Sequence, residues 1–275
     1  MTKKALAIGL AVFLVSMTIA AWAQIAPPSR VVSERLIGKF HASGRPEFLK
    51  VSPDGRRVAY VAVQSGLFGG GKPFVVVDGK EEKPYDRIGT TGIVFSPDSR
   101  RVAYLAQAGN NWFVVVDGKE GKPYDGIGQG TLLFSPDSQR VIYGAVAGNK
   151  RFVVVDGKEE KPYDDIGAGD PIFSPDSKRV AYAARVGNKW LVVVDGKAEK
   201  QYDGIGTLIF SPDSQRVVYG AKGGNRNWFV VVDGNEGKKY DSLLRGGKII
   251  FDSPDTFHYL AETGERIYLV EETIR

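Results

Sequence analysis

Short apolar runs separated by turn-forming residues recur along most of this chain. Between Phe95 and Gly128 the runs VAYLA and WFVVV alternate with the polar stretches SPDSR, AGNN and DGKEGK. Apolar and β-branched runs of this length, bounded by glycine, proline, asparagine and aspartate, are typical of β-strands joined by tight turns. The pattern therefore predicts an all-β chain.

The same pattern returns at a nearly constant interval. The VVVDG run places its aspartate at Asp78, Asp117, Asp156, Asp195 and Asp233, at intervals of 39, 39, 39 and 38 residues. A further step of 38 reaches Glu271, in a weaker sixth copy. Several short strands in a repeat of about 40 residues are typical of a β-propeller. The sequence predicts a six-bladed β-propeller of four-stranded antiparallel blades.

One repeat accounts for the four strands of a blade. Segments such as GIVF and VAYLAQ flank the SPDS turn and form the first two strands, a and b; a Gly-Asn hairpin leads to strand c, WFVVVDG. The continuous valine run indicates a strand buried on both faces. KPYDGIG is predicted to be the outer strand d, where proline is tolerated at an edge. Its recurring tyrosines are expected to pack at the outer rim.

The two ends of the repeat array are predicted to complete one blade. The sixth copy runs from Ile249 and stops after strand c, whereas residues 31–38 precede the first complete copy and end in ERLIG, similar to YDRIG at 85–89. We expect residues 31–38 to supply the missing outer strand and to close the ring, which would remove exposed sheet edges. The predicted propeller domain is 31–275.

The N-terminal residues have the pattern of an export signal. Lys3 and Lys4 precede an apolar run, and an Ala-Trp-Ala cleavage pattern ends at Ala23. This predicts a signal peptide over 1–23 and a proline-containing leader over 24–30; the alternative is a retained signal anchor. There is no cysteine, which excludes disulfides and thiolate sites. We expect a periplasmic or secreted protein without stable membrane insertion after cleavage.

The repeated F-SPDS-x-R-V-A-Y motif followed by VVVDG resembles the WD-like propeller repeat of the TolB type, which also occurs in propellers attached to prolyl-oligopeptidase-like hydrolases. The resemblance covers about 31–275 and implies a six-bladed fold in a periplasmic or secreted setting. We expect neither the additional α/β domain of TolB nor a peptidase domain in this chain, and the Trp-Asp dipeptide of other propeller repeats is absent. The resemblance therefore implies no particular partner or active site.

Few residues indicate catalysis. The SPD aspartates recur in equivalent turns, where aspartate accepts backbone hydrogen bonds, so they are expected to be structural. His41 and His258 are the only histidines; a two-histidine metal site is an alternative to a packing role. No nucleophile or phosphate-binding motif has its required strand-to-helix context, and strand a is mostly aliphatic. We expect no catalytic residue, metal or cofactor; the alternative is a hydrolase or lyase with its site in the propeller funnel.

The surface that varies between repeats is the expected binding face. It carries the b–c hairpins and the d–a connections, whereas the turns at the other end of each blade are nearly identical. It gathers a set of basic residues: Lys72, Lys150, Arg151, Arg185, Lys189, Lys222, Arg226, Arg245 and Lys248. Loss of Lys3 and Lys4 lowers the net charge from +5 to +3, so this local cluster is the main argument for an anionic partner. The sequence predicts a non-catalytic binding or scaffolding module for a protein, a peptide or an anionic envelope polymer, with no nucleic-acid partner.

Overall fold

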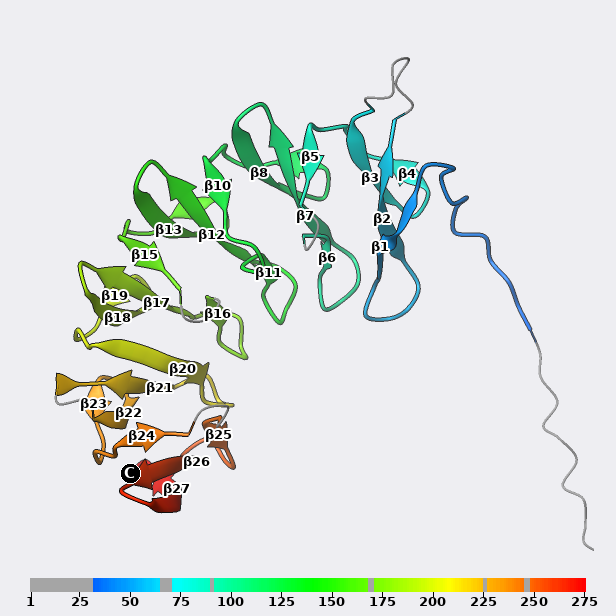
Figure 1. Ribbon diagram of the computed structural model, residues 1–275. Helices are drawn as coiled ribbons and strands as arrows, with labels where there is room; N and C mark the ends of the chain where they lie inside the picture. The colour runs from blue at the N-terminus through cyan, green and yellow to red at the C-terminus, as the bar shows by residue number, and fades with distance from the viewer. Residues whose placement is uncertain (1–31, 65–70, 90–91, 168–170, 225–226, 245–247) are drawn as a thin grey trace, which may run out of the picture. The chain divides into compact units, whose positions relative to one another are not determined.

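The computed structural model describes residues 32–64, 71–89, 92–167, 171–224, 227–244 and 248–275. These residues form strands β1 to β27, arranged in six antiparallel sheets within the compact unit Ile37–Arg275 (Figure 1). The predicted signal peptide and leader lie outside the described residues. In the described ranges, no helix is long and apolar enough to span a membrane. The all-β prediction is confirmed, with the repeated antiparallel sheets of a β-propeller.

The strands follow the repeat along the chain. The first sheet contains β1 (Arg45–Val51), β2 (Val58–Val63), β3 (Pro73–Val77) and β4 (Lys80–Glu81). The second contains β5 (Arg87–Ile88), β6 (Val94–Phe95), β7 (Val102–Ala108), β8 (Asn111–Val116) and β9 (Lys119–Glu120). The third contains β10 (Gly126–Ile127), β11 (Leu133–Phe134), β12 (Val141–Ala147), β13 (Lys150–Val155) and β14 (Lys158–Glu159).

The later sheets repeat this order with small changes. The fourth contains β15 (Asp165–Ile166), β16 (Ile172–Phe173), β17 (Val180–Val186), β18 (Lys189–Val194) and β19 (Lys197–Ala198). The fifth contains β20 (Gly204–Phe210), β21 (Val217–Lys222), β22 (Trp228–Val232) and β23 (Asn235–Glu236). The sixth contains β24 (Ser242–Leu243), β25 (Ile250–Phe251), β26 (Thr256–Thr263) and β27 (Arg266–Thr273).

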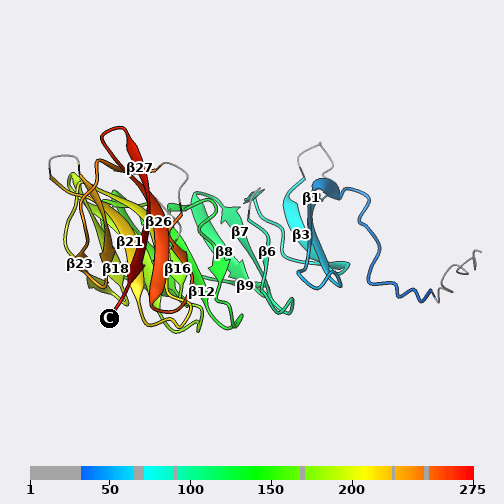
Figure 2. The same cartoon turned by 90° about the horizontal axis from the view of Figure 1, so that it is seen from below.

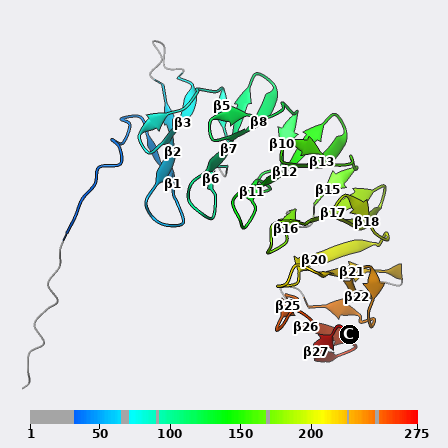
Figure 3. The same cartoon turned by 180° about the vertical axis from the view of Figure 1, so that it is seen from behind.

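The segment predicted as one outer strand is divided between two sheets. Tyr124 forms a bridge with Trp112 at the outer edge of the second sheet, whereas Gly126–Ile127 already pairs with β12 of the third sheet. Pro123 has no N–H for the ladder, so pairing is interrupted just before the tyrosine. Strand d is therefore shorter than predicted, and strand a begins earlier. In the fifth sheet strand a is the continuous β20 (Figure 3).

The turn chemistry read from the sequence is confirmed. At the c–d turn both Asp117 and Gly118 have positive φ, as a type I′ hairpin requires. Two residues join β7 and β8 at the b–c hairpin. Only the first of them, Gly109, has positive φ, which fits a type II′ turn. In the SPDS turn the Ser99 N–H donates to the Ser96 carbonyl at 2.8 Å, across the proline.

The core lies between consecutive sheets. The valine run is buried on both faces, with Val114 2% and Val115 0% exposed. The recurring tyrosines are also buried, and each packs edge to face on a strand-b tyrosine of the next sheet, as Tyr124 does on Tyr143 with ring centroids 6.2 Å apart. Such pairs contribute beyond their buried area. The predicted packing role of these tyrosines is confirmed.

An arginine fastens each of the first four sheets to the one that follows. The guanidinium of Arg140 pairs with Asp156 of its own sheet at 2.9 Å and donates to the carbonyls of Ser177 and Lys178 in the fourth sheet at 3.0 and 2.9 Å. It also lies over the Phe173 ring. We call this arrangement the latch; Arg57, Arg101 and Arg179 repeat it.

The SPD aspartates stabilise the turns beside the latch. The Ser135 hydroxyl donates to the Asp137 carboxylate, which also accepts the Gln139 N–H. The Asp137 N–H donates to the Ser177 hydroxyl of the next sheet at 2.9 Å. The serine hydrogen bond holds the pKa of Asp137 below its usual value. The structural role predicted for these aspartates is confirmed.

The predicted closing strand is not observed. Residues 32–44 contain no strand, and within the described ranges β27 pairs only with β26 (Figure 2). Phe40 stacks on Tyr60, the strand-b tyrosine of the first sheet, with ring centroids 4.4 Å apart; at the other junctions an outer tyrosine contacts the equivalent strand-b tyrosine edge to face. This places Phe40, and not the ERLIG segment, in register with the tyrosine position. A closed ring of six blades stays a prediction.

Candidate functional site

The b–c hairpins and the starts of the strand-a segments lie at the same end of each sheet, which we call the hairpin face. Within the described residues, the aspartate that follows the tyrosine joins these elements at four of the five Tyr-Asp pairs. The Asp86 carboxylate accepts the Gly109 N–H of the β7–β8 hairpin at 2.7 Å, and Asp125, Asp164 and Asp241 make the same contact at their own hairpins. The opposite end, which we call the turn face, carries the SPD turns and the latches.

Five of the nine basic residues predicted for binding are paired with aspartates that lie one or two positions after a recurring tyrosine. Lys72 binds Asp86 at 2.9 Å and Lys150 binds Asp164 at 2.5 Å, while Lys189 pairs with Asp203. Arg151 and Arg185 both pair with Asp165. Because each of these aspartates leads into the next sheet, the lysines help to hold neighbouring sheets together. Their charge is largely compensated.

The remaining predicted residues fall into two groups. Lys222 and Lys248 form no ion pair within the described ranges. Arg226 and Arg245 lie outside the described residues, so the structure does not place them. The sequence interpretation overlooked the aspartates of the hairpin face because it assigned them to the outer strand. The Tyr-Asp pair, present in five copies, was the signal that could have located them.

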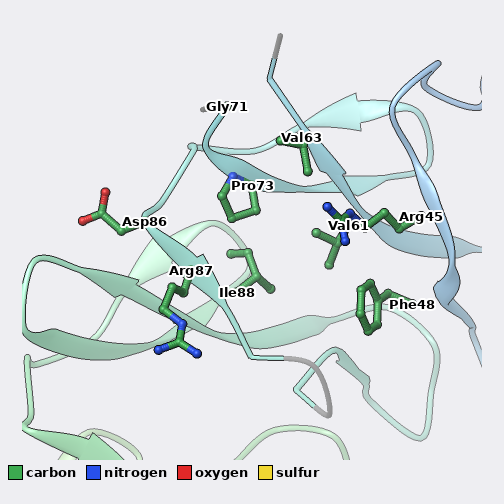
Figure 4. A pocket seen from close by; sticks show the side chains of 9 residues that line it. All are labelled: Arg45, Phe48, Val61, Val63, Gly71, Pro73, Asp86, Arg87 and Ile88. Carbon is green, nitrogen blue, oxygen red and sulfur yellow. The ribbon is translucent and has the colours of Figure 1, made fainter. Parts of the chain in front are cut away.

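A pocket of about 420 Å³ opens between the first and second sheets on this face (Figure 4). Phe48, Val61 and Ile88 supply apolar side chains, and Arg45 and Arg87 flank them from opposite sides. Val61 is buried, whereas both arginines are exposed. A pocket of this size and mixed lining is typical of small-ligand sites.

The electrostatics of the pocket favour an anion. Within the described ranges no carboxylate forms an ion pair with Arg45 or Arg87. The pocket's acid, Asp86, is already bonded to Gly109 and Lys72. The backbone hydrogen bond from Gly109, together with Lys72, holds the pKa of Asp86 below its usual value, so this carboxylate stays ionised and bonded to these two groups. The two guanidinium groups are therefore available to an incoming anion.

This charge arrangement is specific to one junction. In the later repeats Gly126, Asp165, Gly204 and Ser242 stand where the second sheet has Arg87. Arg45 belongs to β1, whose pairing with β2 shifts register between Arg45 and Lys50. The sequence interpretation did not single out either arginine, although the departure of Arg87 from the repeat was visible.

A second pocket, of about 300 Å³, lies between the fifth and sixth sheets. It is lined mainly by apolar groups, including Trp228, Leu243 and Leu260, with Thr207 and the predicted binding residue Lys248 beside them. Among the described residues that line it, Lys248 is the one cation and none is an acid. Its chemistry suits an apolar group more than an anion.

The two histidines have separate local partners. His41 contacts the Ser43 hydroxyl through Nδ1 at 2.8 Å, and its Nε2 lies 3.6 Å from Glu81. His258 contacts Asp252 through Nδ1 at 2.7 Å. In the part of the chain that the structure describes, no three histidine, aspartate or glutamate residues are grouped as metal ligands.

Comparison with known proteins gives similarity in fold. No protein-family model matches the chain, and no curated protein sequence matches it. Among solved structures, TolB from Acinetobacter baumannii is 15% identical, with a TM-score of 0.40, over 79% of this chain and 61% of that one. The β-propeller domain of the Trilobed protease from Pyrococcus furiosus, described as having an open velcro topology, is 14% identical, with a TM-score of 0.43, over 85% and 82%.

An acylaminoacyl peptidase from Pyrococcus horikoshii is 13% identical, with a TM-score of 0.38, over 79% of this chain and 44% of that one. The chain thus spans 61% of the TolB chain and less than half of this peptidase. At these identities the similarity is one of fold. The chain's own repeats and sheets are those of a β-propeller.

Proposed function

We propose that this chain is an exported, non-catalytic binding module that recognises an anionic protein, peptide or envelope polymer through its hairpin face. The observation that carries this proposal is the pair Arg45 and Arg87, which lie beside an apolar floor and form no ion pair with any residue that the structure describes. Charged groups left without partners at a variable surface attract ligands of opposite charge and make association sensitive to salt.

The contrast with the turn face supports the same surface. There, the latch arginines already donate to carboxylates and carbonyls of neighbouring sheets, and the SPD groups bond one another. That end also repeats nearly the same residues from sheet to sheet. A repeated surface with its polar groups occupied offers little to distinguish one asymmetric partner.

The proposal is tested by measuring binding of the mature chain, residues 24–275, to biotinylated poly-L-glutamate at low and high salt. We expect binding that weakens with salt and is lost in the double variant Arg45→Ala/Arg87→Ala. The matched control is Lys119→Ala/Arg216→Ala, which removes the same charge from the turn face. Equal binding by the two double variants, or binding indifferent to salt, would show that the hairpin face is not the site.

Export is a separate part of the proposal. The predicted signal over 1–23 supports a periplasmic or secreted location. N-terminal sequencing of the protein recovered from expressing cells is expected to give Gln24 as the first residue. Recovery of chains that still begin before Ala23 would contradict cleavage and favour the retained anchor.

A further inference from the structure

The pocket between the first and second sheets combines an apolar floor with two cations within one small space. Phe48 and Ile88 are half-buried and pack against the core that the two sheets share, and Val61 is 6% exposed. This floor can take an aliphatic or aromatic group and remove it from water. The pocket volume of about 420 Å³ suits part of a peptide better than the surface of a folded protein.

Both arginines line this pocket, Arg45 beside Val61 and Arg87 at the margin. Figure 4 shows the Arg45 side chain close to Val61 and the Arg87 side chain on the far side of Ile88. Neither guanidinium is held by an ion pair within the described ranges. Arginine binds carboxylates through two parallel hydrogen bonds, and its long side chain lets the planar group swing to meet them.

The occupied acid of the pocket adds selectivity. Asp86 is bonded to the Gly109 N–H at 2.7 Å and to Lys72 at 2.9 Å, so it is not free to pair with either arginine. The same bonds leave it little capacity to attract a cation. The pocket therefore favours a ligand that presents a single anionic group next to an apolar one.

We propose that this pocket binds the C-terminal residue of a peptide that ends in an apolar side chain. In such a residue the carboxylate and the apolar group branch from the same Cα, which matches guanidinium groups placed at the margin of an apolar floor. An aspartate or glutamate side chain supplies the charge without the apolar group. The inference rests on the proposed function, because it names the group through which the partner is recognised.

The test uses fluorescence anisotropy with labelled peptides and the mature chain. The main probe is fluorescein-Gly-Ser-Gly-Ser-Ala-Leu with a free carboxylate, compared with the same peptide as a C-terminal amide and with a peptide that ends in glycine. We expect the amide to bind at least about tenfold more weakly, because a charge-assisted bidentate contact is lost. The glycine-ended peptide should lose about as much, because it leaves the floor empty.

Variants assign the effect to the pocket. Arg87→Ala and Arg45→Ala should each weaken binding of the free acid without changing the melting temperature, since both side chains are exposed. Arg87→Lys should retain part of the affinity. Arg216→Ala, on the turn face, should bind as the unchanged protein does.

Equal affinity for the acid and the amide, or unchanged affinity in both arginine variants, would overturn the inference. If poly-L-glutamate still binds through the hairpin face in that case, only the C-terminal assignment fails. Failure of both ligands to bind would reject the proposed function together with this inference.

Discussion

The two ends of the sheets use arginine in opposite ways. At the turn face the Arg140 guanidinium binds a carboxylate through Nε and two backbone carbonyls through Nη1, and it lies over an aromatic ring. At the hairpin face Arg45 and Arg87 have no carboxylate partner within the described ranges. The comparison shows that position in the repeat, and not residue type, separates an arginine that holds sheets together from one that can meet a ligand.

The turn face contains its own internal comparison. Arg216 occupies the latch position of the fifth sheet and pairs with Asp233 at 2.9 Å, but no bond from it to the sixth sheet is formed within the described ranges. The sixth sheet has Thr256 in the latch position and a shortened turn before it. Within the described residues, the fifth and sixth sheets therefore pack against each other without a latch between them.

Acid should produce the largest loss of stability, because SPD carboxylates of successive sheets titrate together. Serine hydroxyl bonds hold the pKa values of Asp98, Asp137 and Asp176 below the usual aspartate value. A pKa that is lower in the folded than in the unfolded state means that stabilisation is complete above about pH 4 and is lost as the pH falls through the lowered values.

Urea unfolding at a series of pH values should therefore show a constant midpoint near neutrality and a steep fall below about pH 4. The variant Asp137→Asn should start lower at neutral pH and fall less steeply in acid. A midpoint that is the same in the variant and in the unchanged protein at every pH would show that the turn carboxylates do not stabilise the fold.

Breaking one latch should have the next largest effect. Arg140→Ala leaves Asp156 and two carbonyls without their charged donor, so we expect the free energy of unfolding to fall by about 2–3 kcal/mol. Arg216→Ala removes a more exposed ion pair and should cost less than about 1 kcal/mol. Chemical denaturation of both variants measures the difference; equal losses would mean that the inter-sheet bonds contribute nothing.

On the hairpin face, Lys150→Glu should reduce stability by about 1 kcal/mol, because it places a carboxylate beside Asp164 and removes an ion pair. Lys222→Glu is the control on the same face, since Lys222 forms no ion pair within the described ranges. Thermal unfolding should separate the two variants. If both melt like the unchanged protein, the paired lysines are not structural.

The smallest effect is a predicted gain. Glu120, Glu159 and Glu236 pair with lysines of the preceding sheet, whereas the fourth sheet has Ala198 at this position. Ala198→Glu should give Lys161 the missing partner and add about 0.5 kcal/mol, less at high salt. Ala198→Gln is the uncharged control. A loss of stability in Ala198→Glu that Ala198→Gln does not show would contradict the prediction.

The sequence was sufficient for the parts of the fold that depend on local chemistry. Asp-Gly, Gly-Asn and Ser-Pro-Asp restrict backbone conformation over two to four residues, and each forms the predicted turn. The valine run forms a doubly buried strand because burial on both faces requires an apolar residue at every position. These features needed no knowledge of neighbouring sheets.

The features that were missed depend on contacts between sheets. The KPYDGIG segment was read as one strand because its pattern does not show where the chain passes from one sheet to the next. That error displaced Asp86, Asp164 and Asp203 from the face where they pair with lysines. The candidate pocket was not predicted for the same reason, since Arg45 and Arg87 are 42 residues apart and line one pocket only because two sheets are neighbours.

The near identity of the latches affects how the chain reaches its folded state. The arginine of one repeat would fit the serine turn of almost any other, so the contacts themselves carry little information about which sheets should be neighbours. Correct order then depends on the short connections between consecutive sheets, which give the proper neighbour a high effective concentration. At high protein concentration a repeat from another molecule can compete, and mispaired or exchanged sheets become the characteristic failure of folding.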